Sequence, residues 1–433
     1  MRILIISDYF APDNEIAAVR VTKIGKYLSL AGYNVDVLRR GKSGRKEDIL
    51  LKNDLQYFDN VFNNYNSGVY NILYKYFFSK SNNGNNKYVS NWNQLKNIIE
   101  KYKILKVIKD ILVHLLLELI EINYYSMAIS KNDIYYGRYN FIFSSFGPLS
   151  SHLIGTYIKK KYKNIKWIAD FRDPMNSFWV PDIFKYYINF LEREVQKNAD
   201  IVTLVSSGCC SFFSSKTYII PNGFDDNDIY KQYNIIQLPS KKYIYTYTGH
   251  LYDGKMNFNT FFKIIKELIA DEIISYKDIE INYLGKDSDV FLKQARLFLP
   301  ENIIKNHGYV SREESIKFQS ESNALLLASW NNNKEQGNIT GKVYEYLMAR
   351  KPILCFISGN LADSELKNII KNTETGCCYE EANSQIDYNI MKKYIMNHLL
   401  YWKNGENTNY SPKDNYIEQY NFKTIVKKLV TLF

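Results

Sequence analysis

Short apolar runs alternate with segments of helical spacing along most of this chain, and that alternation limits the folds open to it. The run RILIIS (Arg2 to Ser7) precedes a segment, Val19 to Tyr33, with apolar residues at helical spacing, and the run NVDVLR follows. Uninterrupted apolar runs are typical of strands that are buried on both faces, as in parallel sheets covered by helices. The N-terminal residues therefore predict a βαβ unit and an α/β fold.

The alternation stops between residues 45 and about 137, then resumes in two further series. The two series meet at IIPNGFD (Ile219 to Asp225), where Pro221 and Gly223 favour a turn. A chain of 433 residues is also too long for one ordinary core. We therefore expect an N-terminal Rossmann-like domain at residues 1–222, with a variable insert at about 45–137. A C-terminal Rossmann-like domain should follow at residues 223–411. Residues 412–433 should form a C-terminal helix that packs back toward the N-terminal domain.

The insert contains one strongly apolar segment. From Leu105 to Ile122 the chain reads LKVIKDILVHLLLELIEI, in which lysines and acidic residues are spaced among leucines and isoleucines. This pattern predicts an amphipathic helix. Such a helix covers a core or lies on a membrane or a partner, and the sequence leaves both alternatives open.

Positive charge is concentrated in the N-terminal half. Residues 1–222 contain 30 Lys and Arg against 19 Asp and Glu, whereas residues 223–433 contain 26 of each, so the whole net charge of +11 lies in the first half. A basic domain is suited to an anionic membrane surface, a phosphorylated substrate or a nucleic acid. No nucleic-acid-binding module is recognisable, so we expect no nucleic-acid partner.

The cysteines predict neither a metal site nor a disulfide framework. The five Cys include two adjacent pairs, and there is no CxxC motif or Cys/His cluster. The N-terminal MRILIISDYF enters a strand directly and does not resemble a signal peptide. No uncharged apolar run reaches the roughly 18–20 residues of a membrane-spanning helix. We therefore expect a cytoplasmic protein without a structural metal.

One stretch, NITGKVYEYLMARKPILCF (Asn338 to Phe356), reads as a turn, a short helix and a buried strand. The helix N-terminus offers unpaired N–H groups to an anion, and Gly341 lets the backbone approach a ligand closely. Glu345 repels phosphate but can accept hydrogen bonds from a ribose diol. This arrangement suits a nucleoside diphosphate, although a capped surface helix with a solvated glutamate would show the same residues.

Six segments, in the same order as in a known enzyme family, favour the nucleotide site over the capped surface helix. They resemble the GT-B glycosyltransferases, specifically family-4-like enzymes (glycosyl transferases group 1), over nearly the whole chain except the insert. The segments are SDYFAPDNEIAAVRVTKIGKYLSLAGYNVDVL, which includes Arg20, then WIADFRDP, ADIVTLVS, IIPNGFD, YTGHLYDGK and ITGKVYEYLMARKPIL. The resemblance implies two Rossmann-like domains that face each other across a cleft, and retaining, metal-independent transfer of a sugar from a nucleotide-diphosphate sugar to an acceptor hydroxyl.

The resemblance also implies roles for individual residues. Glu345 matches the carboxylate that binds ribose, and Lys255 matches the lysine that neutralises the leaving diphosphate. Asp173 follows an N-domain strand, where a polar group faces the sugar. Arg172 either acts together with Asp173 at the sugar or forms a structural pair with a carboxylate. Five further residues match positions near the diphosphate: Thr340, Gly341, Lys342, Gly249 and His250. Gly308 and Val310 match the loop that flanks the nucleotide base.

Two positions depart from the family pattern. Gly337 lies eight residues before Glu345, where the family often has a first glutamate, and His250 stands where an arginine commonly contacts the diphosphate. A catalytically silent GT-B subunit that binds a partner or glycan, and a nucleotide-sugar epimerase or phosphorylase of the same architecture, are therefore alternatives. Because the N-terminal half is basic, we expect the transferase to use a glycan or lipid-linked acceptor in surface-polysaccharide assembly. We also expect peripheral contact with the anionic inner face of the cell membrane.

Other enzyme classes lack their motifs. Asp287–Ser288–Asp289 forms a DxD sequence, which a metal-dependent GT-A enzyme requires, but it follows a predicted strand, where a loop or helix-cap role is expected. No G-x-G-x-x-G follows the first strand, as a dehydrogenase would need. No G-x-S-x-G nucleophile elbow is present either. The donor is thus a substrate, and no separate cofactor is expected.

Overall fold

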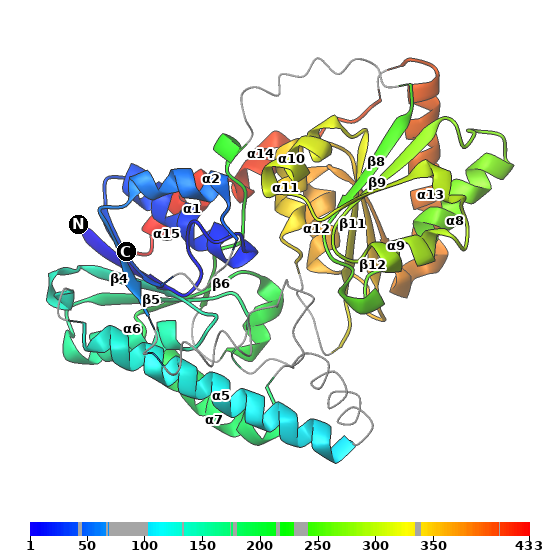
Figure 1. Cartoon of the computed structure of the whole chain (residues 1–433). Coiled ribbons are helices and arrows are strands. Elements are labelled where there is room, and N and C mark those ends of the chain that lie inside the picture. The colour runs from blue at the N-terminus through cyan, green and yellow to red at the C-terminus, as the bar shows by residue number, and fades with distance from the viewer. Residues whose placement is uncertain are drawn as a thin grey trace. The chain divides into compact units, whose positions relative to one another are not determined.

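A computed structural model describes most of the chain (Figure 1). The described residues are 1–41, 46–65, 68, 103–131, 134–173, 175, 180–213, 217–228, 241–333, 339–406 and 408–433. They form two compact units, the N-terminal unit (1–205, 212–219 and 432–433) and the C-terminal unit (206–211 and 220–431). Much of the predicted insert lies outside the described residues.

The N-terminal unit is built on a parallel sheet of seven strands in the order β3-β2-β1-β4-β5-β6-β7. Its first strand in the chain, β1, pairs with β2 on one side and with β4 on the other, so that Ile3 lies beside both Val35 and Phe141. The strands are β1 (Arg2–Ser7), β2 (Asn34–Arg40), β3 (Asn60–Asn64), β4 (Phe141–Ser145), β5 (Lys166–Phe171), β6 (Ile201–Leu204) and β7 (Thr217–Ile219).

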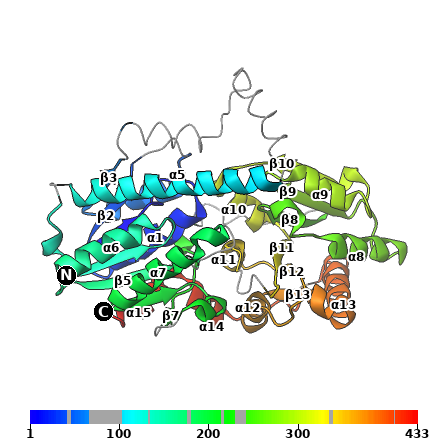
Figure 2. The same cartoon turned by 90° about the horizontal axis from the view of Figure 1, so that it is seen from below.

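Helices cover this sheet on both faces. On one face α6 contacts β1, β4 and β5, with α5 and α7 beside it, and Figure 2 shows these three helices together. α1 contacts β1 and β2 on the other face (Figure 1). The helices are α1 (Ile16–Leu30), α2 (Ile49–Asn53), α5 (Lys103–Ile129), α6 (Ser150–Lys161) and α7 (Asp182–Asn198).

The C-terminal unit contains a parallel sheet of six strands in the order β10-β9-β8-β11-β12-β13. Tyrosines and phenylalanines fill much of its core: Tyr245 of β8 packs edge-to-face on Phe261 at a centroid distance of 5.0 Å. The strands are β8 (Tyr243–Thr248), β9 (Ile279–Leu284), β10 (Ile304–Gly308), β11 (Ala324–Trp330), β12 (Ile353–Ser358) and β13 (Gly376–Glu380).

The helices of the C-terminal unit alternate with its strands, as the sequence predicts. They are α8 (Asn259–Ala270), α9 (Ser288–Ala295), α10 (Arg312–Glu321), α11 (Lys342–Ala349), α12 (Glu365–Thr373) and α13 (Ser384–Lys403), followed by α14 (Asp414–Ile417) and α15 (Phe422–Val430). The last two residues, Leu432 and Phe433, belong to the N-terminal unit, where the Phe433 ring stacks on Phe141.

The predicted fold class is confirmed: both sheets are parallel, doubly wound and of Rossmann type. In each sheet the strand order reverses beside the first strand, between β1 and β4 and between β8 and β11. The element boundaries differ more. The first helix begins at Ile16 instead of Val19. α5 extends to Ile129, beyond the predicted Ile122, because Tyr124 and Ala128 continue its buried face.

Candidate functional site

The reversal of strand order in the second sheet places α11 at a position suited to ligand binding. β11 pairs with β8, and α11 follows β11 in the chain. In open α/β sheets, ligands bind outside the carboxyl ends of the strands at such a reversal. The predicted nucleotide helix therefore begins at the edge of the C-terminal unit where a ligand is expected.

α11 begins as the sequence predicts. It runs over eight residues, Lys342–Ala349, with Gly341 at the N-cap position. Gly341 has φ −58° and ψ −21°, an ordinary helical conformation, so the backbone torsion itself does not require glycine. The absence of a side chain at this position still leaves the helix N-terminus open to close approach. The hydroxyl of Thr340 lies 3.5 Å from the backbone nitrogen of Lys342.

Glu345 lies in the first turn of α11 and is held by three cationic or polar side chains. Its carboxylate accepts hydrogen bonds from Lys342 Nζ at 2.9 Å, Gln319 Nε2 at 3.0 Å and Arg312 Nε at 3.4 Å. The side chain is 15% exposed. Burial alone would raise the pKa of this carboxyl group, but Lys342 and Arg312 outweigh that effect and lower its pKa to about 2. Glu345 is therefore an ionised acceptor at neutral pH.

Sequence analysis missed the two residues of α10 that fix this carboxylate. Besides contacting Glu345, Arg312 pairs with Asp228 at 2.8 Å, and Gln319 donates to the hydroxyl of Thr248 at 3.0 Å. Thr248 ends β8, so this network ties α10, α11 and the end of β8 together. No sequence motif marks Arg312 or Gln319, because their partners lie far away in the chain and are brought close only by the fold.

Three glycine-containing loops close-pack at the same edge of the sheet. The amide of Gly249 donates to the Leu284 carbonyl at 2.9 Å, and the amide of Gly285 donates to the Gly308 carbonyl at 2.8 Å. A Cβ atom on Gly285 would lie 2.1 Å from the Gly249 carbonyl oxygen, and Gly308 has a φ of +66°. The loops after β8 and β9 can approach each other this closely because Gly285 lacks a side chain, whereas Gly308 supplies a positive φ that other residues rarely adopt.

The loop after β8 carries His250 and Lys255. Asp287 anchors this loop: its carboxylate accepts from the backbone amide of Leu251 at 2.6 Å and lies 3.4 Å from His250 Nδ1. Asp287 is the N-cap residue of α9, as expected, although its side chain bonds the neighbouring loop instead of its own helix. Lys255 Nζ lies 5.2 Å from the ring centre of Trp330, at the end of β11.

The structure thus gathers the predicted donor residues along the carboxyl edge of the second sheet. Val310 follows the end of β10, close in sequence to Gly308. The prediction for Lys342 concerns its backbone at the start of α11, and its ammonium group lies 2.9 Å from the Glu345 carboxylate. Gly337, the position of the missing first glutamate, lies outside the described residues.

Arg172 and Asp173 follow β5 in the N-terminal unit and have different environments. The Arg172 guanidinium donates to the backbone carbonyls of Phe146 at 2.8 Å and Gly147 at 3.1 Å, so it fastens the loop after β4 to the end of β5. The predicted structural alternative was a pair between Arg172 and a carboxylate. The structure shows the two carbonyls as its hydrogen-bond acceptors, and burial lowers the Arg172 pKa while the nearby carboxylates of Asp173 and Asp170 act to raise it. Asp173 is exposed. The carboxylate is thus accessible to a ligand, while the guanidinium is engaged in holding the backbone.

A buried ion pair lies beneath this edge of the first sheet. Arg20 of α1 contacts both oxygens of Asp170, from Nε at 3.0 Å and from Nη2 at 2.7 Å, and both side chains are at most 2% exposed. Ser145 and Thr203 also donate to Asp170. Burial would raise the pKa of Asp170, but Arg20 and the two hydroxyls lower it. Arg20 therefore joins α1 to the centre of the sheet.

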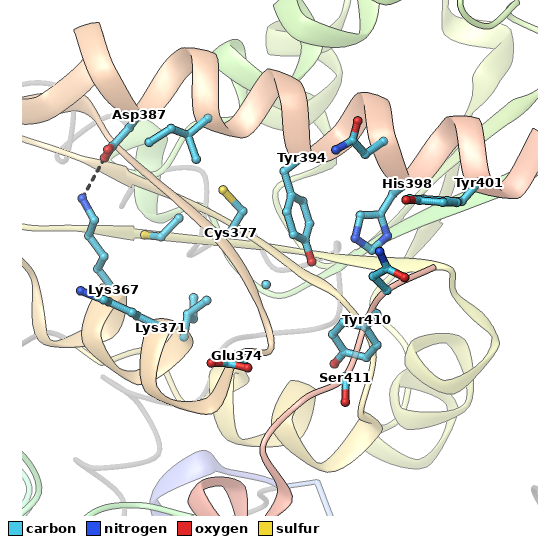
Figure 3. A pocket seen from close by; sticks show the side chains of 16 residues that line it. Lys367, Lys371, Glu374, Cys377, Asp387, Tyr394, His398, Tyr401, Tyr410 and Ser411 are labelled. Carbon is cyan, nitrogen blue, oxygen red and sulfur yellow. Dashed lines mark hydrogen bonds and ion pairs between the residues drawn. The ribbon is translucent and has the colours of Figure 1, made fainter. Parts of the chain in front are cut away.

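A separate cavity of about 610 Å³ opens in the C-terminal unit between α12, β13, α13 and residues 409–411. Figure 3 shows Tyr394, His398 and Tyr410 beside it, with the Lys367–Asp387 ion pair of 3.0 Å at one side. Gly376, at the first position of β13, also lines the cavity. None of the lining residues is a predicted donor residue, so this cavity is distinct from the carboxyl edge described above.

Comparisons with solved structures agree with this architecture. The chain resembles an α,α-trehalose 6-phosphate synthase from Burkholderia multivorans (TM-score 0.54, 8% identity, covering 100% of this chain and 98% of that one). It also resembles the N-terminal domain of the Candida albicans trehalose-6-phosphate phosphatase (TM-score 0.56, 8% identity, 99% and 96% covered). An S. aureus MnaA–UDP structure aligns at a TM-score of 0.46 and 14% identity, with 99% and 95% covered.

At these identities the likeness concerns the fold and not the reaction. No protein-family model matches the chain, and a search of curated proteins gives no match. The parallel sheets with their flanking helices, and the likeness along the whole chain, show that the protein has the GT-B fold, with two Rossmann-like domains.

Proposed function

We propose that this protein is a retaining, metal-independent glycosyltransferase that moves a sugar from a nucleotide-diphosphate sugar to an acceptor hydroxyl. The observation that carries the proposal is the ionised Glu345 carboxylate in the first turn of α11, at the carboxyl edge of the second sheet. A fixed anion there accepts hydrogen bonds from the two hydroxyls of a ribose. The preceding helix N-terminus then receives the diphosphate.

The Lys255 cation, on the loop after β8, would stabilise the leaving diphosphate, and the backbone of Thr340, Gly341 and Lys342 at the start of α11 would bind it. His250, on the same loop as Lys255, would also contact the diphosphate. As the bond between the sugar and the diphosphate breaks, negative charge grows on the phosphate oxygens, and preorganised cations lower the energy of that transition state. Gly308 and Val310 would flank the base. No divalent metal is needed for this chemistry.

The N-terminal unit would bind the acceptor. Asp173 is exposed after β5 and would contact the transferred sugar or the acceptor hydroxyl, whereas Arg172 would hold the loop that positions it. Catalysis then rests mainly on positioning and on leaving-group stabilisation. The basic charge of this half suits a glycan or lipid-linked acceptor at the inner face of a cell membrane, as in surface-polysaccharide assembly.

The test is a transfer assay with radiolabelled nucleotide sugars of uracil, guanine, adenine and thymine, using a total lipid extract of the source organism as acceptor. We expect label from one donor to enter the lipid fraction, with retention of anomeric configuration by NMR. Lys255→Met and Glu345→Gln variants should lose this transfer, whereas Glu314→Gln, an exposed first-turn glutamate of α10, should keep it.

Two results would overturn the proposal. Conversion of a nucleotide sugar to its epimer, without transfer, would identify an epimerase of the same fold. Failure of every donor, together with failure of every nucleoside diphosphate to bind, would identify a catalytically silent subunit.

A further inference from the structure

α5 has apolar residues on two opposite faces, of which only one is covered. Ile120, Tyr124 and Ala128 are fully buried in the N-terminal unit. On the other side a stripe of aliphatic residues at three- and four-residue spacing is exposed: Leu112 by 60%, Leu115 by 43%, Leu119 by 49% and Ile122 by 46%. The exposed face of an ordinary surface helix is polar, so this stripe calls for a partner.

α7 carries a second exposed stripe. Ile183, Tyr186 and Phe190 are exposed by 68%, 88% and 55%, again at three- and four-residue spacing. The first turn of α7 contacts the middle of α5, where the rings of His114 and Phe184 lie 4.5 Å apart. Figure 2 shows α5 and α7 on the same side of the N-terminal unit. The two stripes, on neighbouring helices of the same side, are here called the apolar face: Leu112, Leu115, Leu119, Ile122, Ile183, Tyr186 and Phe190.

Basic residues border the apolar face. The stripe on α7 continues at the same spacing into Arg193 and Lys197, both exposed. Lys185 lies between its apolar members, is 41% exposed and pairs with Asp182 at 2.6 Å. α6, between α5 and α7, ends in three lysines, of which Lys160 is 58% exposed. An apolar and aromatic centre with a basic border complements an anionic bilayer, because lysine and arginine meet the headgroups while tyrosine and aliphatic side chains enter the interface.

We propose that the apolar face docks the N-terminal unit onto the surface of an anionic lipid bilayer. The proposal rests on the proposed function, because it supplies the membrane at which a lipid-linked acceptor would be presented. A second copy of this chain fits less well, since the basic border would then face itself.

α5 lies on the bilayer and does not cross it. In the described part of the chain, one segment is long and apolar enough to span a membrane: Ile111–Ile129, of which 22% is buried. However, Glu121 pairs with Arg40 at 2.6 Å and accepts from Ser150, and Asn64 donates to the Tyr124 carbonyl at 2.9 Å. These buried bonds fasten the inner face of α5 to the sheet, so only the outer stripe can meet lipid.

The location of the apolar face also defines the side on which an acceptor would arrive. The exposed apolar residues of α7 lie in its first half, and α7 follows β5 through the segment that contains Arg172 and Asp173. In a parallel sheet the helix begins on the side where the preceding strand ends. The docked bilayer would therefore lie at the side of the unit from which Asp173 is reached, and an acceptor lipid could keep its tail in the membrane.

The test is vesicle flotation of the full chain with phosphatidylcholine alone and with equal parts of phosphatidylcholine and phosphatidylglycerol. We compare the wild type with two double variants, Leu115→Ser with Leu119→Ser, and Ile183→Ser with Phe190→Ser. The control is Leu297→Ser with Ile386→Ser in the C-terminal unit, which are exposed by 67% and 59%, close to the values of Ile183 and Phe190. All substituted side chains are at least 43% exposed, and circular dichroism of each variant should show unchanged folding.

We expect the wild type and the control to float with the anionic vesicles. Each double variant should bind these vesicles roughly tenfold more weakly, because two apolar side chains no longer enter the interface. A wild type that floats with neither vesicle, or variants that float as well as the wild type, would overturn the proposal. So would a dimer, detected by sedimentation velocity, that the variants dissociate. Nucleoside diphosphate binding, measured on the same variants, reports separately on the proposed function and should not change.

Discussion

The ammonium group of Lys342 and the carboxylate of Glu345 lie one helical turn apart on α11 and meet at 2.9 Å. Because Glu345 has a pKa of about 2 in the folded protein, below its ordinary value of 4.5, its stabilising contribution is complete above pH 4.5 and is lost as the pH falls toward 2. That contribution is on the order of 3 kcal/mol. Urea unfolding of the wild type and Glu345→Gln should show a stability difference that shrinks between pH 6 and pH 3. A difference independent of pH would contradict this account.

Lys255 should act in catalysis more than in binding. Replacing it with methionine removes a cation near the departing diphosphate, so kcat should fall roughly a hundredfold while stability hardly changes. Lys263→Met is the matched control, because Lys263 also lies above an aromatic ring, that of Tyr388 at 5.0 Å, on helix α8 away from the strand ends. Steady-state kinetics with the accepted donor would measure the effect, and equal losses in both variants would argue against a specific role for Lys255.

The buried pair of Arg20 and Asp170 should be essential for stability. Asp170→Asn leaves the Arg20 guanidinium buried without its counter-charge, which we expect to cost about 3–5 kcal/mol in unfolding free energy. The comparison is Lys185→Ala, which removes a solvent-exposed pair with Asp182 and should leave the unfolding free energy almost unchanged. Urea denaturation would measure the unfolding free energy of both variants. Similar small losses of unfolding free energy would show that the buried pair is dispensable.

Arg172 and Asp173 are neighbours whose substitutions should separate stability from activity. Arg172→Met leaves the carbonyls of Phe146 and Gly147 without their donor and should destabilise the protein by about 1–3 kcal/mol. Asp173→Asn changes an exposed side chain, so the unfolding free energy should stay within about 0.5 kcal/mol. If Asp173 contacts the sugar, transfer should nevertheless fall by roughly tenfold or more. An Asp173→Asn enzyme of normal activity would remove Asp173 from the site.

Outside the insert, the order of strands and helices could be predicted because each element carries its own signal. Within residues 45–137, α2 and the edge strand β3 were not predicted. β1 is an uninterrupted apolar run, and α11 begins after a turn with Gly341 and a first-turn glutamate. The partners of Glu345 could not be predicted, since Arg312 and Gln319 reach it only after α10 and α11 pack together. Local sequence patterns do not predict contacts between residues that lie far apart in the chain.

The insert shows a different limit of the sequence. A helix that is apolar on two faces, as α5 is, has no polar side from which its orientation could be assigned. Only the structure shows that Tyr124 is buried while Leu112 is exposed.

The most direct test of the central claim is isothermal titration calorimetry of UDP, GDP, ADP and dTDP against the wild type, Glu345→Gln and Glu314→Gln. We predict that one diphosphate binds the wild type and Glu314→Gln with equal affinity and binds Glu345→Gln roughly tenfold or more weakly, because a charged hydrogen-bond acceptor for the ribose is lost. Equal affinity for the wild type and Glu345→Gln, or no binding of any diphosphate to the wild type, would contradict the assignment of a nucleotide-sugar site at α11.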